Sequence, residues 1–323
     1  MRTLKEKLLY AFEQNRGEVL SGQALADTNG VSRAAIWKAV QGLRQEGHVL
    51  EAVTNGGYQL LSDQLSEMGV LAHLGQWPAP VVVTKETGST NRDLLRLAAE
   101  GAPHGTLVLS EQQTEGRGRA GKPFFSPEGA GLYMSVLIKP RQGENPTKVT
   151  VAAAVAACRA MEPFSQDPPR IKWVNDVFLR GKKSAGILTE AFVDLECLVP
   201  QSIVMGIGIN IYPPKGGYPP ELDPIVTCLF PDGRAPKDFS RCRLAADMAR
   251  AFLNLCDHWD DPGMMEEYRQ KSFLLGRDVT FWDHGNPVDG VATGINEDGN
   301  LLVETDRGTV VLQAGEVRVR GRE

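Results

Sequence analysis

The stretch EGRGRAGKPFFSP at residues 115–127 decides which kind of nucleotide-binding fold this chain can form. Its glycines fit the dinucleotide pattern G-x-G-x-x-G, and with the lysine they fit most of the phosphate-loop pattern G-x-x-x-x-G-K. Both patterns require a helix directly after the glycines, because its N-terminus holds the phosphate. Here Pro123 and Pro127 bracket the next residues, and the strand-like GAGLYMSV follows. The sequence therefore predicts neither a Rossmann fold nor a phosphate loop.

Two arginines between these glycines leave two interpretations of the stretch. Arg117 and Arg119 are solvated on a flexible surface loop, or they fold over an anionic ligand. Arginine offers planar, bidentate donors to phosphate or carboxylate, and glycine permits close approach and mobility. On the second interpretation we expect the loop to be disordered without ligand and ordered with it.

The segments around this loop mix strands and helices without a strict βαβ repeat, which favours an α+β domain with a mixed sheet over a doubly wound one. The expected strands are VVVTKE (81–86), TLVLSEQ (106–112), GLYMSVLIKP (131–140), IKWVNDVFL (171–179), AGILTEAFV (185–193) and SIVMGIGINI (202–211). The expected helices are NRDLLRLAAEG (91–101), TKVTVAAAVAACRAM (147–161) and RLAADMARAFLNLCDHW (243–259).

The two ends of the chain have a different character. Residues 1–63 predict a winged helix-turn-helix: SGQALADTNGVSRAAIWKAVQGLRQEG (21–47) holds two helices around Gly30, and Asn55-Gly56-Gly57 is a hairpin turn signal. The last fifty residues are short strands with Asp-Gly or Arg-Gly turns, typical of a small barrel of about five strands. We therefore expect four segments, namely 1–63, a linker at 64–80, a catalytic domain at 81–272 and a barrel at 273–323.

Bulk composition excludes several classes of protein. The net charge of −5 rules out a generally basic nucleic-acid coat, so DNA binding requires a local patch. The five cysteines form no C-x-x-C pair, which fits a reduced, cytoplasmic chain. The N-terminus does not read as a signal peptide, and no apolar run reaches membrane-spanning length. No membrane partner is expected.

Five motifs together resemble the biotin protein ligase family. They are ETGSTN (86–91), QTEGRGRAGKPFFSP (113–127), KWVNDVFL (172–179), KKSAGIL (182–188) and GIGIN (206–210), in matching order and spacing. The N-terminal segment resembles the bifunctional subgroup, whose ligase also represses the biotin operon. This resemblance implies a central domain of the class II synthetase/biotin ligase type and an SH3-like C-terminal barrel. It implies ATP, Mg²⁺ and biotin as ligands, with biotin carboxyl carrier protein as acceptor.

The resemblance assigns roles to single residues. Those expected to bind biotin are Ser89, Thr90, Asn91, Gln113, Gly116, Arg117, Lys183 and Gly186. Those expected to bind ATP or the adenylate are Arg119, Phe124, Asn175, Lys183 and Asn210. Lys183, Arg119 and Asp176 are the expected catalytic residues. Asp176 is the candidate Mg²⁺ ligand, but it could instead orient Lys183 or only hold the hairpin. Phe124, Lys122 and Val174 replace the tryptophan, arginine and proline that are usual in the family.

Simpler interpretations stand beside several of these roles. Ser89 or Thr90 caps the following helix. Lys183 is a solvated charge at a strand end, as most lysines are. Asn210 is a turn residue. For Gln113 we expect a side chain on the face opposite that of Gln112.

The second helix of the helix-turn-helix, SRAAIWKAVQGLRQEG (32–47), is the expected DNA reader. Ser32, Arg33, Trp37, Lys38 and Arg44 are its candidate contacts. Residues 1–63 carry seven basic and seven acidic side chains, which predicts weak binding by a monomer. A dimer, promoted by biotinyl-5′-AMP as in the family, would present two half-sites of operator DNA. The helices could instead form a protein-binding module.

Two further functions compete with the bifunctional one. A transcription factor could sense biotin without ligating it, but the intact Arg119 and Lys183 argue for the enzyme. A lipoate or octanoate transfer enzyme has a related core. The GRGR loop and the attached winged helix argue against that reading.

Overall fold

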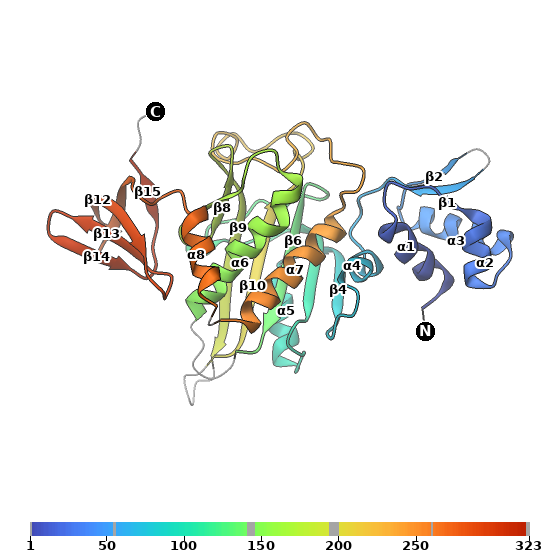
Figure 1. Ribbon diagram of the computed structural model, residues 1–323, viewed down its shortest axis with the longest axis horizontal. Coiled ribbons are helices and arrows are strands. Elements are labelled where there is room, and N and C mark those ends of the chain that lie inside the picture. The colour runs from blue at the N-terminus through green and yellow to red at the C-terminus, as the bar shows by residue number, and fades with distance from the viewer. Residues whose placement is uncertain (1, 54–55, 141–145, 194–199, 260, 321–323) are drawn as a thin grey trace.

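The computed structural model describes residues 2–53, 56–140, 146–193, 200–259 and 261–320. Three units follow one another along its longest axis: a helical N-terminal unit, a large central sheet with helices, and a C-terminal sheet (Figure 1). Among the described residues, no helix has the length and apolarity that crossing a membrane requires.

The N-terminal unit is the predicted helix-turn-helix with its hairpin. Its elements are α1 (Leu4–Gln14), β1 (Leu20–Ser21), α2 (Gly22–Asn29), α3 (Arg33–Gln45), β2 (Leu50–Val53) and β3 (Gly57–Leu60). Gly30 ends α2 in the left-handed conformation, with φ 63°, and Ser32 caps α3 by accepting from the amide of Ala35 at 3.2 Å. Ala26 and Ile36 are buried between the helices. The predicted turn residue Asn55 lies outside the described residues.

The central sheet has seven strands in the order β4-β5-β6-β10-β9-β8-β7, and only β4 and β5 pair in parallel. The strands are β4 (Val81–Thr87), β5 (Leu107–Gln113), β6 (Gly131–Ile138), β7 (Arg170–Lys172), β8 (Asp176–Leu179), β9 (Lys182–Val193) and β10 (Pro200–Asn210). Helices α6 (Pro146–Met161) and α7 (Arg241–Asp257) cover one face, and α5 (Thr90–Ala99) covers the other (Figure 1). The predicted mixed sheet is confirmed.

Two expectations about the central region were incomplete. The segment 171–179 is a hairpin rather than one strand: β7 turns at 173–175, and Lys172 pairs with Asp176 in β8. The expected linker contains α4 (Glu67–Leu74), which Ser66 caps and which buries Val70 and Leu74. The helix α8 (Pro262–Lys271) was not predicted either.

The C-terminal strands form a five-stranded antiparallel sheet in the order β14-β13-β12-β11-β15. They are β11 (Asp278–Asp283), β12 (Asn286–Ile295), β13 (Leu301–Thr305), β14 (Gly308–Leu312) and β15 (Val317–Val319). The indole of Trp173 donates to the carbonyl of Gly299 at 2.8 Å, which fastens this sheet to the β7–β8 turn. In the described part of the chain β14 and β15 do not pair, so closure into a barrel stays a prediction.

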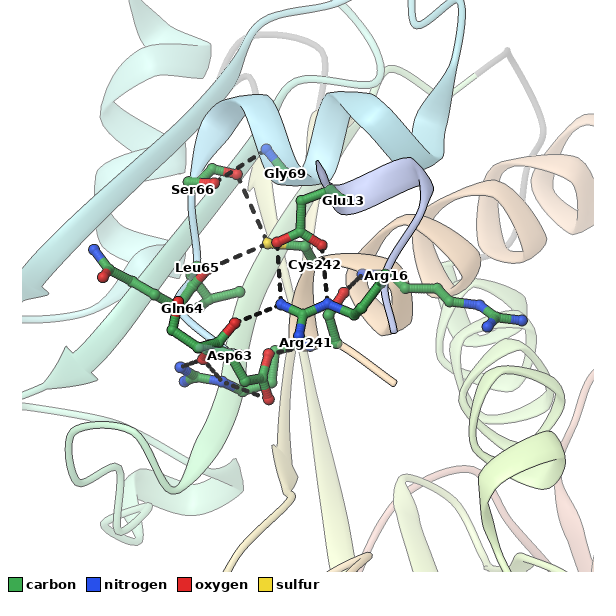
Figure 2. Close-up of polar contacts among 12 residues, drawn as sticks. Glu13, Arg16, Asp63, Gln64, Leu65, Ser66, Gly69, Arg241 and Cys242 are labelled. Atoms are coloured by element: carbon green, nitrogen blue, oxygen red, sulfur yellow. Dashed lines mark hydrogen bonds and ion pairs between the residues drawn. The ribbon is translucent and has the colours of Figure 1, made fainter. Parts of the chain in front are cut away.

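A buried network of charges joins the N-terminal unit to the central sheet (Figure 2). The Arg241 guanidinium, at the start of α7, donates to both carboxylate oxygens of Glu111, at 2.7 and 3.1 Å. Its Nε also donates to the carbonyl of Asp63 at 3.2 Å, and Glu111 accepts from the amide of Leu65 at 2.7 Å. Burial disfavours the charged form of Arg241, but the carboxylates of Asp63 and Glu111 raise its pKa above the ordinary value.

Candidate active site

Three glycines form the floor of a pocket between β9 and β10. A Cβ at Gly206 would lie 1.9 Å from Asn91 Oδ1, and one at Gly208 would lie 2.3 Å from Phe124 Cε1. A Cβ at Gly186 would lie 3.1 Å from Lys183 Nζ. These side chains therefore lie directly on the strands, as only glycine permits. The predicted Gly186 lines this pocket, and Gly206 and Gly208 join it.

The glycine- and arginine-rich loop at 115–127 is a folded hairpin over this floor. Gly118 donates its amide to the carbonyl of Lys122 at 2.7 Å, and Phe124 donates to that of Gly116 at 2.8 Å. A short 3₁₀ turn at Arg119–Gly121 forms the tip. Gly116 does not line this pocket, so its biotin-binding role stays a prediction; a Cβ there would lie 2.5 Å from the carbonyl oxygen of Phe124, which gives this glycine a structural role in the hairpin. The expectation that the loop is disordered without ligand stays a prediction.

Hydroxyl and amide groups line one wall of the pocket. Ser89 occupies the N-cap position of α5, yet its side chain makes no capping hydrogen bond. The capping interpretation of Ser89 is therefore wrong, and its side chain lines the pocket. Thr90 donates from its amide and hydroxyl to Gln113 Oε1, at 2.9 and 3.1 Å. Gln113 lines the pocket, as expected, and its Nε2 donates to Ser126 at 3.1 Å.

Asn91 has its amide held by neighbouring groups. Its Nδ2 donates to Glu190 Oε2 at 2.7 Å, and its Oδ1 accepts from the Ser135 hydroxyl at 2.6 Å. The Ser135 hydroxyl oxygen also lies within hydrogen-bond distance of the Thr90 hydroxyl, at 2.8 Å. A group with all its polar atoms engaged is fixed in orientation, so Asn91 shapes the wall of the pocket.

The cationic residues gather where the loop meets the β7–β8–β9 hairpins. Lys183 Nζ lies 2.7 Å from Asp176 Oδ1 in an ion pair. Arg119 Nη1 donates to Asn175 Oδ1 at 3.3 Å, and Asn175 Nδ2 donates to the carbonyl of Ile187 at 2.8 Å. The structure thus brings Arg119, Lys183 and Asn175 to the same pocket. Arg117 lines it too, from the base of the loop.

A second chamber opens on the other side of Phe124. It shares Arg119, Phe124 and Lys183 with the first pocket and has a volume of about 470 Å³. Asn210 lines it at the end of β10, and its Nδ2 donates to the carbonyl of Thr227 at 3.0 Å. Lys122 pairs with Glu316 of the C-terminal segment at 2.8 Å, so this segment closes one side of the chamber. The first pocket has a volume of about 50 Å³, and the Phe124 ring lies over its floor, so a second ligand there requires this ring and the hairpin to move.

The chemistry of Asp176 fits a single-carboxylate magnesium site. Its Oδ1 is buried, forms the ion pair with Lys183 and has no further hydrogen-bond partner among the described residues. Among the described residues, no cluster of three or more metal-ligating side chains occurs. Mg²⁺ commonly binds through one or two carboxylates together with substrate phosphates and water. Asp176 therefore suits an ion that arrives with a nucleotide.

The DNA-reading candidates lie on α3. Arg33 and Lys38 are exposed, and Trp37 is 57% exposed, an unusual position for a large aromatic ring. Ser32 uses its hydroxyl as the cap of α3. Arg44 donates from Nε to the carbonyl of Leu50 at 3.1 Å, so it holds β2 against the helix rather than standing free.

Several site residues escaped the sequence interpretation. Ser126, Ser135 and Glu190 orient Gln113 and Asn91. Ser126 lies within the motif at 113–127 but had no assigned role, and Ser135 and Glu190 lie outside the five motifs. The alternating glycines of GIGIN were the available signal for Gly206 and Gly208, because alternate residues of a strand share one face. Glu316 lies far along the chain from Lys122, and no local pattern connects them.

Comparison with known proteins finds a matching family for each of the three units of the fold. Residues 83–210 match the biotin/lipoate A/B protein ligase family, residues 5–59 match a helix-turn-helix domain, and residues 274–320 match the biotin protein ligase C-terminal domain. The chain is 31% identical to the bifunctional ligase/repressor BirA of Bacillus subtilis, over 98% of this chain and 99% of that protein. It is 29% identical to BirA of Escherichia coli, over 95% of each.

A solved structure extends the comparison. The biotin protein ligase from Aquifex aeolicus in complex with biotin and ATP has a TM-score of 0.62 and 26% identity. The match covers 75% of this chain and 98% of that one. The chain therefore belongs to the biotin protein ligase family, in the group that joins the ligase to an N-terminal helix-turn-helix domain.

Proposed function

We propose that this protein joins biotin to ATP as biotinyl-5′-AMP, transfers the biotinyl group to a lysine of biotin carboxyl carrier protein, and represses biotin genes when it holds the adenylate. Family membership over nearly the whole chain supports a bifunctional ligase and repressor. The observation that carries the proposal is the meeting of two chambers at Arg119 and Lys183.

The side chains that line the pocket over the glycine floor suit biotin, which would enter once the Phe124 ring moves off that floor. Biotin has a polar ureido ring, an apolar tail and a carboxylate, and such ligands need a few placed polar groups in a closed site. Ser89, Thr90 and Gln113 offer hydroxyls and an amide at one end of the pocket, while Arg117 and Lys183 offer cations elsewhere on its lining. The Phe124 ring covers the floor between them.

The first step brings two anions together. An oxygen of the biotin carboxylate attacks the α-phosphorus of ATP, and the bond from that phosphorus to the diphosphate oxygen breaks. Lys183 and Arg119 line both chambers, which supports a role for them in stabilising the transition state electrostatically. Magnesium, held by the phosphates and Asp176, would supply charge neutralisation and a defined geometry for the leaving diphosphate. The hairpin at 115–127 shields the resulting anhydride from water.

The second step needs no nucleophile from this chain. The neutral amine of the carrier lysine attacks the acyl carbon, the bond from that carbon to the AMP oxygen breaks, and the amine loses one proton. The site holds the adenylate in place, so catalysis consists of positioning and electrostatics. We place this chemistry in the cytoplasm, with no membrane partner.

The repressor activity uses α3 in the major groove of operator DNA. Arg33, Trp37 and Lys38 are exposed for contacts, whereas Ser32 and Arg44 act within the unit. The balance of charge in residues 1–63 supports binding as a dimer with two half-sites. We propose that the bound adenylate promotes that dimer.

Mass spectrometry and a transfer assay test the proposal. Protein incubated with biotin and MgATP should retain biotinyl-5′-AMP, and labelled biotin should then appear on the carrier protein. A sensor without ligase activity would bind biotin and incorporate none. Transfer of octanoate without ATP would instead support the related transferase function.

A further inference from the structure

A chain of polar contacts runs from strand β9 to the residues that line the first pocket. Glu190 contacts Asn91, which contacts Ser135. Ser135 contacts Thr90, and Thr90 contacts Gln113. The side chains of Asn91, Thr90 and Gln113 line the pocket, whereas Glu190 and Ser135 do not, and Ser135 is fully buried. Glu190 and Ser135 therefore influence a ligand only through the lining residues.

The direction of the hydrogen bonds in this chain starts at Glu190. A carboxylate accepts hydrogen bonds and does not donate them. The Asn91 Nδ2 atom therefore faces Glu190, at 2.7 Å, and its second hydrogen goes to the carbonyl of Leu188 at 3.2 Å. With both amide hydrogens in use, Asn91 turns Oδ1 toward Ser135, at 2.6 Å. Glu190 thus fixes which end of the Asn91 amide faces Ser135.

The Ser135 hydroxyl has one hydrogen, and Asn91 Oδ1, which can only accept, receives it. That hydrogen is then not available to Thr90, although the two hydroxyl oxygens lie 2.8 Å apart. The Thr90 oxygen keeps its lone pairs for a donor on a ligand. If Asn91 were reversed, its Nδ2 would donate to Ser135, and the Ser135 hydrogen would turn to Thr90 and occupy one of these lone pairs.

Gln113 adds a donor to the same wall. Its Oε1 accepts from the Thr90 amide at 2.9 Å, and its Nε2 donates one hydrogen to Ser126 at 3.1 Å. The second Nε2 hydrogen has no acceptor among the described residues, so it is available to a ligand carbonyl. A cyclic urea has N–H donors on both sides of one carbonyl. It matches a wall with an acceptor at Thr90 and a donor at Gln113.

We propose that Glu190 and Ser135 are positioning residues that set this donor and acceptor pattern and so select a ligand with a cyclic urea. The inference rests on the proposed function, in which that ligand is biotin. The same contacts could only hold α5 on the sheet, because Asn91 belongs to α5 while Ser135 and Glu190 belong to β6 and β9. The two roles differ in what they predict for biotin affinity in a folded variant.

Variants at position 190 change the direction of the chain. In Glu190→Lys the ammonium only donates, so Asn91 would turn Oδ1 to it and Nδ2 to Ser135. In Glu190→Gln the amide can donate or accept, so both directions are allowed. Ser135→Ala interrupts the chain. As controls, Glu266→Lys makes the same change of charge on exposed α8, and Thr150→Val removes a hydroxyl contact between α6 and β9.

Calorimetric titration of the full-length protein measures the effect with biotin and with desthiobiotin, which keeps the urea but lacks the thioether ring. We expect both dissociation constants to rise by about tenfold or more in Glu190→Lys and Ser135→Ala, and by about threefold in Glu190→Gln. In the Ser135→Ala background, Glu190→Lys should add less than about twofold, because the chain is already interrupted. The KM for ATP and the kcat of diphosphate release should stay at wild-type values, as should both controls.

Other outcomes contradict the proposal. Additive effects of Glu190→Lys and Ser135→Ala would show that the two residues do not act through one chain. A loss for biotin without an equal loss for desthiobiotin would place the effect at the thioether ring. A lower kcat or a raised KM for ATP would assign the contacts to the folding of the site. If thermal unfolding shows that Glu190→Lys is misfolded, wild-type affinity in Glu190→Gln decides against the proposal. Failure of the wild type to bind biotin would contradict the proposed function instead.

Discussion

Replacement of Arg241 by methionine tests whether the buried charge network holds the N-terminal unit to the ligase. Arg241 is 3% exposed and its partner Glu111 is 8% exposed. Removal of one partner from a buried pair leaves an uncompensated charge, which destabilises by about 3–5 kcal/mol. At about 2–4 °C per kcal/mol for a unit of this size, Tm should fall by about 6–20 °C.

Chemical denaturation and calorimetry measure this effect, and a double-mutant cycle isolates it. Glu111→Gln keeps an acceptor for the Leu65 amide, so Arg241→Met/Glu111→Gln should be less destabilised than the sum of the single variants. We expect a coupling of about 0.5–3 kcal/mol. An Arg241→Met protein within about 0.5 kcal/mol of wild type, or additive variants, would refute the role of this network.

Three further predictions concern the glycine floor, pH and DNA. Gly208→Ala should clash with Phe124 and weaken biotin binding by about 1–3 kcal/mol in calorimetric titration, whereas Gly22→Ala should leave it unchanged. Burial lowers the pKa of His48 below 6.5, so the unfolded state takes up more protons and the unfolding free energy should fall as pH drops below that value; His48→Phe should flatten this slope. Lys38→Ala should weaken binding to DNA from upstream of the biotin genes and reduce the salt slope by about one, while Arg44→Ala should mainly lower the stability of the N-terminal unit.

Local sequence signals predicted the elements that depend on local physics. Ser32 and Gly30 marked the boundaries of the helices around the turn, because caps and left-handed residues act within a few positions. Strands of the central sheet were predicted from their apolar runs. The hairpin at β7–β8 was not, because an apolar run does not reveal a tight turn inside it.

The sequence identified residues that line the pocket, but it did not identify the residues that hold them and the surrounding fold in place. Gln113, Lys183 and Arg119 belong to motifs and line one pocket, while their roles toward biotin and ATP stay predictions. Glu111 and Arg241 bond across 130 positions of sequence, so no periodicity or local motif joins them. The orientation of Arg44 likewise depends on where β2 packs.

The most direct test of the proposed chemistry is adenylate formation by Lys183→Met under single-turnover conditions, with biotin binding measured in parallel. Lys183 lies where the two chambers meet, and loss of a transition-state charge partner should slow formation by about a hundredfold or more. Biotin binding should weaken far less. Adenylate formation at the wild-type rate would contradict the claim that this lysine offsets the charge of the two reacting anions.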